Sequence, residues 1–309
     1  VNYERYTTKV LPPDWAQTYH YTVANPANQA EAEALCQYVL ILDALNFCFW
    51  PLQGYEYEHL ASSLKRTLEQ DPAAFSAASL INLTEDTLAQ WLQPPAEFPL
   101  ISTAANPAAT PTALGYSIPL LAARTRLLRE VGAVLAAKFD GKAYNMIASA
   151  NKSALALMRI VTSSFPGFRD HLQWGGDQVF FYKRAQIFVG DVWGAFAGKF
   201  IGEFTDMQML TCVADYRVPQ LLRGMGILKC RPDVDAAIEA LTEIPAGSEE
   251  EVCIRAVTVQ AVEAIRSKMA AKGITVHAFQ LDWILWEAGE KLMKEGKIVP
   301  HHRTITTYY

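Results

Sequence analysis

NQAEAEALCQYVLILDALNFCF, residues 28–49, predicts a buried helix. Its apolar residues recur every three or four positions, which is the period of one helix face. The most apolar part, residues 38–50, still contains Asp43 and Asn46 and is shorter than the ~20 residues that a membrane-spanning helix needs. The stretch therefore favours a helical protein without a membrane span.

The same periodicity predicts helices in much of the remaining chain. The segments are residues 60–72, 117–139, 248–269 and 280–296. Ser117 is placed to cap the second of these segments, with Pro119 in its first turn. Ser248 and Glu251 have capping-box spacing at the start of the third. Helices therefore dominate the predicted fold.

Strand patterns are scarce. DQVFFYK, residues 177–183, predicts one arm of a small hairpin that turns at Gly175-Gly176. Residues 93–119 are rich in Pro, Ala and Thr, which is typical of a surface loop. We expect a mainly α fold, one compact helical domain over residues 1–309, with at most this small β-hairpin.

Composition excludes several classes of protein. The 309 residues are 51% hydrophobic and 19% charged, enough for a large core, and the net charge of −5 argues against a stable nucleic-acid partner. The five cysteines include no C-x-x-C pair and the six histidines no H-E-x-x-H pair, so neither a disulfide framework nor a metal site is expected. No secretory signal is recognisable. We expect a cytoplasmic protein that has no metal or organic cofactor and does not bind a membrane.

Two cations follow three aromatic residues and begin an otherwise apolar predicted helix in FFYKRAQIFVGDVWGAF, residues 180–196. Lys183 and Arg184 oppose the positive end of the helix dipole there, so their position needs a reason. Together with free backbone N–H groups they could bind an anion. Alternatively, Arg184 pairs with Asp191 two turns along the same helix.

Two acids lie beside apolar segments. Asp215, in TCVADYRVPQ (residues 211–220), could cap a helix that starts near Pro219, pair with Arg217, or act as a catalytic carboxylate. Asp282 and Trp286 are four residues apart and share a helix face, where a carboxylate and an indole could bind a purine-like base. The alternative is a core tryptophan, with Asp282 bonded to neighbouring backbone.

Six sequence blocks, in order, resemble the queuosine salvage proteins. The blocks are DALNFCFW, SSFPGFRD, FYKRAQIFVGDVW, VADYRVPQLLRGMGIL, LDWILW and PHHRTITTYY. The resemblance extends from about His20 to Tyr309, and only the Pro-rich loop at 93–116 has no counterpart.

This resemblance implies an N-glycosyl hydrolase that needs no cofactor. Its substrate would be queuosine 5′-monophosphate or queuosine, and its product the 7-deazaguanine base queuine, for reinsertion into tRNA. It also implies an all-helical fold similar to base-excision DNA glycosylases. By motif, Asp215 and Lys183 would be catalytic, while Asp282 with Trp286, His20 and Arg184 would bind substrate. His20 matches its motif more loosely than the others.

Two other functions remain open from the sequence. A DNA-type glycosylase/lyase would use Lys183 to form a Schiff base with the sugar. A non-catalytic helical scaffold would instead place Asp215 and Lys183 far apart in a closed core. The distance between these two side chains therefore separates an enzyme from a scaffold.

Overall fold

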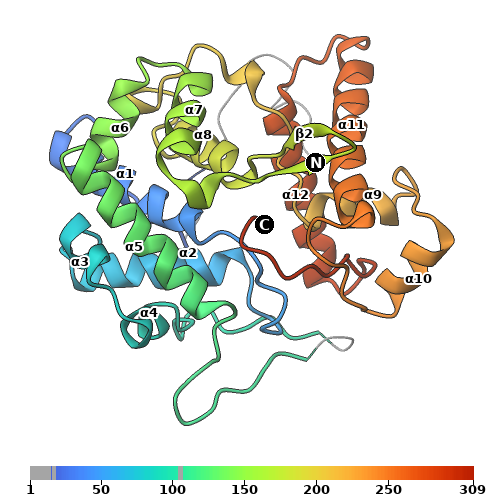
Figure 1. The fold of residues 1–309 in the computed structure, drawn as a ribbon, viewed down its shortest axis with the longest axis horizontal. Helices are drawn as coiled ribbons and strands as arrows, with labels where there is room; N and C mark the ends of the chain where they lie inside the picture. The colour runs from blue at the N-terminus through green and yellow to red at the C-terminus, as the bar shows by residue number, and fades with distance from the viewer. Residues whose placement is uncertain (1–14, 16–18, 104–106) are drawn as a thin grey trace.

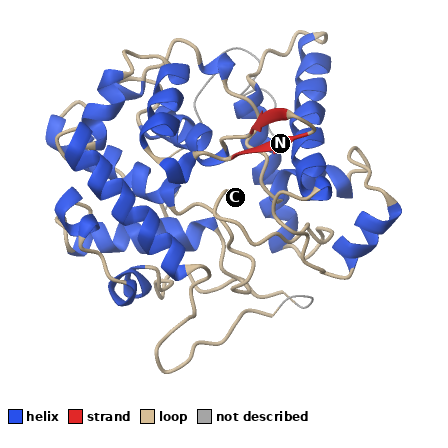
Figure 2. Cartoon of the chain, viewed as in Figure 1, coloured by secondary structure: helices blue, strands red, loops and turns tan. Residues whose placement is uncertain are grey.

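Helices dominate the computed structural model, which describes Trp15, residues 19–103 and residues 107–309 (Figure 1, Figure 2). Its α-helices are α1 (Gln29–Ala44), α2 (Tyr57–Gln70), α3 (Ala77–Ile81), α4 (Glu85–Trp91), α5 (Leu121–Lys138), α6 (Ala143–Ser149), α7 (Ala154–Ser164), α8 (Lys183–Ala195), α9 (Arg217–Gly224), α10 (Pro232–Glu239), α11 (Glu249–Ala270) and α12 (Ala278–Lys294). Strands β1 (His171–Trp174) and β2 (Asp177–Phe180) form one antiparallel pair. The predicted mainly α fold class with a small hairpin is confirmed.

Two parts of the predicted architecture stay predictions. One is the single domain over residues 1–309, of which residues 1–14, 16–18 and 104–106 lie outside the described residues. The other is the likeness to base-excision DNA glycosylases. Among the described helices, none has the length and apolar character needed to cross a bilayer.

Helix α1 is the centre of the larger helical group and packs against α2, α5, α6 and α8. Asn28 caps it, because the Asn28 side chain accepts the backbone N–H of Glu31 at 3.2 Å. Most of its length is buried, as its sequence predicts. The prediction is wrong at the C-terminal end, because α1 stops at Ala44 and not at Phe49.

Buried cations explain why α1 ends early. The last carbonyls of a helix lack partners within it and carry its negative dipole end. Arg184 donates to the Ala44 carbonyl at 2.7 Å, and Lys183 donates to the Asn46 carbonyl at 2.9 Å. Arg124 binds further carbonyls of the same turn. These long-range bonds stabilise an unwound segment that the helical pattern did not predict.

Of the two predicted helix N-caps, the one at Ser248 forms and the one at Ser117 does not. Ser248 accepts the Glu251 N–H at 3.3 Å as predicted, but the Glu251 carboxylate accepts from the Gly247 N–H and not from Ser248. Ser117 does not cap α5, which begins after Leu120 in the left-handed conformation (φ 53°). The cap prediction for Ser117 is therefore wrong, because the helix starts further along the chain.

The hairpin and the long loop form as expected. Gly175 and Gly176 connect β1 to β2 with φ of 55° and 96°, a left-handed pair that glycine adopts without steric strain. The described parts of residues 93–119 contain no helix. Backbone bonds from Ile101 and Ala109 attach this loop to the segment between α1 and α2.

A second helical group consists of α9, α11 and α12, which pack against one another and lie to one side of the molecule (Figure 1). Gly190 of α8 lets the two groups approach, because a Cβ there would lie 1.7 Å from the Phe279 ring of α12. The start of α8 and the first turns of α12 consequently lie beside one pocket.

Candidate active site

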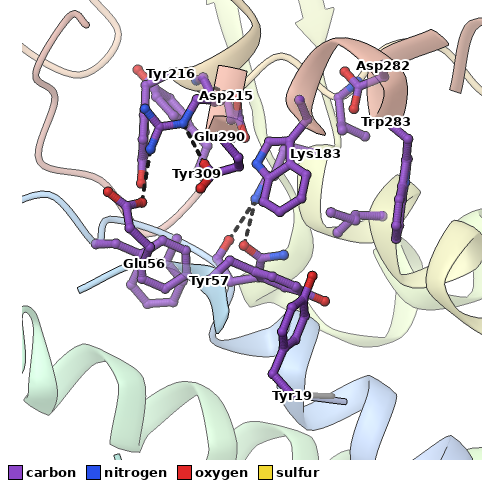
Figure 3. A pocket seen from close by; sticks show the side chains of 17 residues that line it. Tyr19, Glu56, Tyr57, Lys183, Asp215, Tyr216, Asp282, Trp283, Glu290 and Tyr309 are labelled. Atoms are coloured by element: carbon purple, nitrogen blue, oxygen red, sulfur yellow. Dashed lines mark hydrogen bonds and ion pairs between the residues drawn. The ribbon is translucent and has the colours of Figure 1, made fainter. Parts of the chain in front are cut away.

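A pocket of about 680 Å³, including its mouth, lies between the two helical groups (Figure 3). Its wall comes from the unwound end of α1, the start of α2, the N-terminal half of α8, residues 213–217, α12 and Tyr309.

Four of the six residues singled out from the sequence line this pocket. They are Lys183, Asp215, Asp282 and Trp286. His20 lies one layer behind the wall, with its Nε2 atom 2.9 Å from the hydroxyl of the pocket-lining Tyr57. Arg184 is not part of the wall.

Lys183 presents a buried ammonium to the pocket. Its backbone N–H donates to the Asp170 carboxylate at 3.1 Å, and its Nζ atom donates to the Asn46 carbonyl and to Asn46 Oδ1 at 2.9 and 3.1 Å. Burial lowers the pKa of Lys183, and the negative charge of Asp215 is the largest influence in the opposite direction. An ammonium has three N–H donors, so one remains beyond the two that Asn46 accepts.

Asp215 both binds the start of helix α9 and lines the pocket. Its Oδ1 atom accepts the backbone N–H groups of Arg217 at 2.8 Å and Val218 at 3.4 Å, so it caps α9. That helix begins at Arg217, before the proline where the sequence predicted it. The same half-buried carboxylate lines the pocket, and its Oδ2 atom is not needed for the cap. The predicted ion pair with Arg217 does not form, because that guanidinium bonds to Glu290 and Glu56.

Asp282 both bonds to neighbouring backbone and lines the pocket, the two alternatives that the sequence left open. Its Oδ1 atom accepts the Cys212 thiol at 2.9 Å and the Val213 backbone N–H at 3.1 Å, and its carboxyl lines the pocket. Burial, followed by the negative charge of Asp215, raises the pKa of Asp282 well above its usual range. A neutral carboxyl in this position can both donate and accept hydrogen bonds.

Aromatic rings surround the Asp282 carboxyl. Trp283 and Trp286 from the same helix line the pocket, and Tyr57 meets the Trp286 ring edge-on with 5.8 Å between centroids. Flat apolar surfaces next to a carboxyl are suited to binding a planar heterocycle with polar edges. Trp283 was not singled out from the sequence.

Arg184 is buried and bonds to backbone carbonyls. It is 1% exposed, donates to the carbonyls of Ala44 and Gly167, and lies over the Phe168 ring with 4.9 Å to the centroid. Its predicted ion pair with Asp191 does not form among the described residues, because the Arg184 donors point to these carbonyls.

Glu56, Arg217 and Glu290 form a charged wall that sequence reasoning missed. The Arg217 guanidinium donates to Glu290 at 2.7 Å and to Glu56 at 3.1 Å. Burial raises the pKa of Glu290 to about 7, although the Arg217 charge opposes this shift. Glu290 lies four residues after Trp286, so the helix-face spacing could have found it. Glu56 comes from a distant segment without any comparable signal.

Arg255 and Asp170 form a second buried ion pair behind the pocket. Arg255 donates from two nitrogens to the Asp170 carboxylate at 2.9 and 2.6 Å. Its Nε atom donates to the carbonyl of Ala214, the residue before Asp215, at 3.0 Å. Because Asp170 also accepts the Lys183 N–H, this pair connects the segments that carry Asp215 and Lys183.

The pocket brings charged, acidic and aromatic side chains together. A carboxylate, an ammonium and a carboxyl framed by aromatic rings surround one cavity (Figure 3). Within the part of the chain that the structure describes, no group of three or more His, Cys, Asp or Glu side chains could hold a metal ion.

Comparisons with known proteins point to one family. Residues 24–309 match the family described as queuosine salvage protein. A relative from Dictyostelium discoideum is 42% identical over 298 residues, covering 96% of this chain and 85% of the relative. One from Sphaerobacter thermophilus is 41% identical over 311 residues, covering 97% and 87%, and one from Mus musculus is 30% identical over 299 residues, covering 90% and 82%. All three relatives are named queuosine 5′-phosphate N-glycosylase/hydrolase.

Proposed function

Because the chain belongs to the queuosine salvage protein family, we propose that it hydrolyses the N-glycosidic bond of queuosine 5′-phosphate and releases queuine. The names of the relatives support this substrate. The observation that carries the assignment is that Asp215, Lys183, Asp282 and Trp286, from three separate segments, line one pocket.

Asp215 is proposed to act at the sugar. Cleavage of an N-glycoside builds positive charge on the sugar in an oxocarbenium-like transition state. The Oδ2 atom of Asp215 can face that charge while Oδ1 remains bound to the start of α9. The carboxylate would then either stabilise the cation or attack the anomeric carbon.

Asp282 is proposed to bind the base edge between the tryptophan rings. Its Oδ1 atom is held by Cys212 and Val213, which orients the other oxygen toward the ligand. The Lys183 ammonium is proposed to bind the 5′-phosphate as a buried cation. His20 would act through the Tyr57 hydroxyl that it contacts.

The two other functions are less well supported. A scaffold with a closed core would separate Asp215 from Lys183, whereas both line the same pocket. A DNA-type lyase needs many phosphate contacts to hold a duplex, and the net charge is −5. It also needs a lysine amine free to attack, whereas the Lys183 ammonium is hydrogen-bonded twice to Asn46.

The direct test is incubation of the purified protein with queuosine 5′-phosphate and detection of free queuine by mass spectrometry. We expect stoichiometric release of queuine and ribose 5-phosphate. No release above the uncatalysed background would contradict the proposed function.

Asp282→Ala should weaken base binding. The substitution removes an acceptor and leaves donors of the base without a partner in a buried site, at a cost of about 1–3 kcal/mol. Calorimetric titration with queuine measures the change, and Asp233→Ala, at an exposed acid of α10, serves as the control. Unchanged queuine affinity would assign Asp282 a structural role instead.

Lys183→Met should lower kcat/KM more for queuosine 5′-phosphate than for queuosine, because only the nucleotide carries the phosphate. The matched control is Lys199→Met, an exposed lysine beyond the end of the same helix, which should leave both values unchanged. An equal loss on both substrates would place the ammonium at the sugar. Borohydride added during turnover should trap no adduct, whereas an adduct lost in Lys183→Met would support the lyase chemistry.

A further inference from the structure

Two carboxyl groups, Asp43 of α1 and Asp191 of α8, form a fully buried pair beneath the pocket. Asp43 Oδ2 and Asp191 Oδ1 are buried without a hydrogen-bond partner among the described residues, and each carboxyl lies close enough to affect the pKa of the other. Two neighbouring carboxylates that are both ionised repel each other strongly in a buried site, so this arrangement favours a proton on one of them. The pair therefore holds a proton in a site that water does not reach.

A tyrosine connects this pair to the pocket. The Tyr57 hydroxyl donates to Asp191 Oδ2 at 3.4 Å, and Tyr57 is part of the pocket wall. The Tyr57 oxygen also lies 2.9 Å from His20 Nε2. In Figure 3, Tyr57 lies on the side of the Lys183 ammonium opposite to Asp215 and Asp282. The hydroxyl thus connects Asp191 to a residue of the pocket wall.

The surroundings favour one retained proton on the pair. Burial raises the pKa of Asp43 to about 7, although the charges of Lys183 and Arg184 oppose the shift. Burial and the negative charge of Asp43 raise the pKa of Asp191 well above its usual range. The other groups that face the pair are neutral, namely the Asn46 amide, which donates to Asp43 at 3.5 Å, and the hydroxyls of Tyr19, Tyr38 and Tyr57.

We propose that the Asp43–Asp191 pair supplies the proton that departs with the base and that the Tyr57 hydroxyl relays it. This rests on the proposed function, because a 7-deazaguanine leaves poorly without a proton. As the bond between C1′ and the base breaks, the base nitrogen keeps the electron pair and takes the Tyr57 proton. Tyr57 is reprotonated by Asp191. Water then adds its oxygen to C1′ and its proton passes to Asp215, which releases it in the open pocket. A proton returns from the pocket through the Tyr57 hydroxyl to Asp191 and restores the pair.

The test compares two leaving groups. Asp43→Asn, Asp191→Asn and Tyr57→Phe are assayed on queuosine 5′-phosphate and on 4-nitrophenyl β-ribofuranoside 5′-phosphate, whose phenolate leaves without a proton. We expect kcat on queuosine 5′-phosphate to fall about 10²–10⁴-fold, as for loss of a general acid, with little change in KM. The nitrophenyl substrate should be cleaved at close to the wild-type rate. Tyr55→Phe, a buried tyrosine outside the pocket, is the matched control and should retain activity on both substrates.

The pH profile gives a second readout. A general acid must be protonated, so wild-type kcat should fall at high pH, where Asp191, whose pKa lies well above its usual range, loses the last proton of the pair, and the variants should lack this decline. An asparagine amide can donate in place of the shared proton, so folding is expected to persist and is checked by thermal melts. Equal losses on both substrates, or no loss on either, would overturn the proton relay. Release of queuine by the wild type would still support the proposed function in that case. A wild type that releases no queuine would overturn both.

Discussion

Asp215→Asn should leave the fold intact and lower kcat on queuosine 5′-phosphate by about a hundredfold or more. The asparagine oxygen can still accept the N–H groups of Arg217 and Val218, so the cap of α9 is kept. The negative charge opposite the developing sugar cation is lost. Steady-state kinetics measure the rate, and a thermal melt shows whether the helix cap survives.

Asp206→Asn is the matched control for this variant. Asp206 also binds the start of a helix, accepting the backbone N–H of Ala154 at 2.5 Å and the Ser153 hydroxyl at 2.7 Å, but it does not line the pocket. We expect its substitution to leave kcat unchanged. Turnover of Asp215→Asn at the wild-type rate would refute the assignment of Asp215.

Arg255→Met should destabilise the protein by about 3–5 kcal/mol, the cost of leaving a buried charge without its partner. Asp170 would lose two hydrogen bonds, and the Ala214 carbonyl would lose its donor. Because this pair connects the segments of Asp215 and Lys183, kcat on queuosine 5′-phosphate should fall as well. Urea unfolding measures the free energy of unfolding.

The double variant Asp170→Asn with Arg255→Met separates the buried charge from the lost contacts. Removing both charges should cost less than the sum of the two single variants, because Asp170 then no longer leaves an unpaired buried charge, while the Arg255–Glu251 contact is lost equally in Arg255→Met and in the double variant. Additive losses, or a free energy of unfolding unchanged in Arg255→Met, would show that the pair does not stabilise the site.

Local sequence determined most of the secondary structure. The apolar spacing of residues 280–296 predicted α12, and the spacing between Asp282 and Trp286 placed both on the pocket side of that helix. The glycine pair at 175–176 predicted the hairpin. These signals are readable because helix period and turn conformation depend on neighbouring residues.

Contacts between distant segments decided the rest. The sequence predicted Arg184 at the site and a helix through Phe49, whereas in the tertiary structure Arg184 binds the carbonyl of Ala44, where α1 ends. Glu56, at the start of α2, lines the pocket and pairs there with Arg217 from another helix. A buried cation takes whichever acceptor the packed core offers, since leaving it unpaired is too costly. The sequence therefore identified the longest helices and four of the pocket residues, while packing selected the partners of the buried charges.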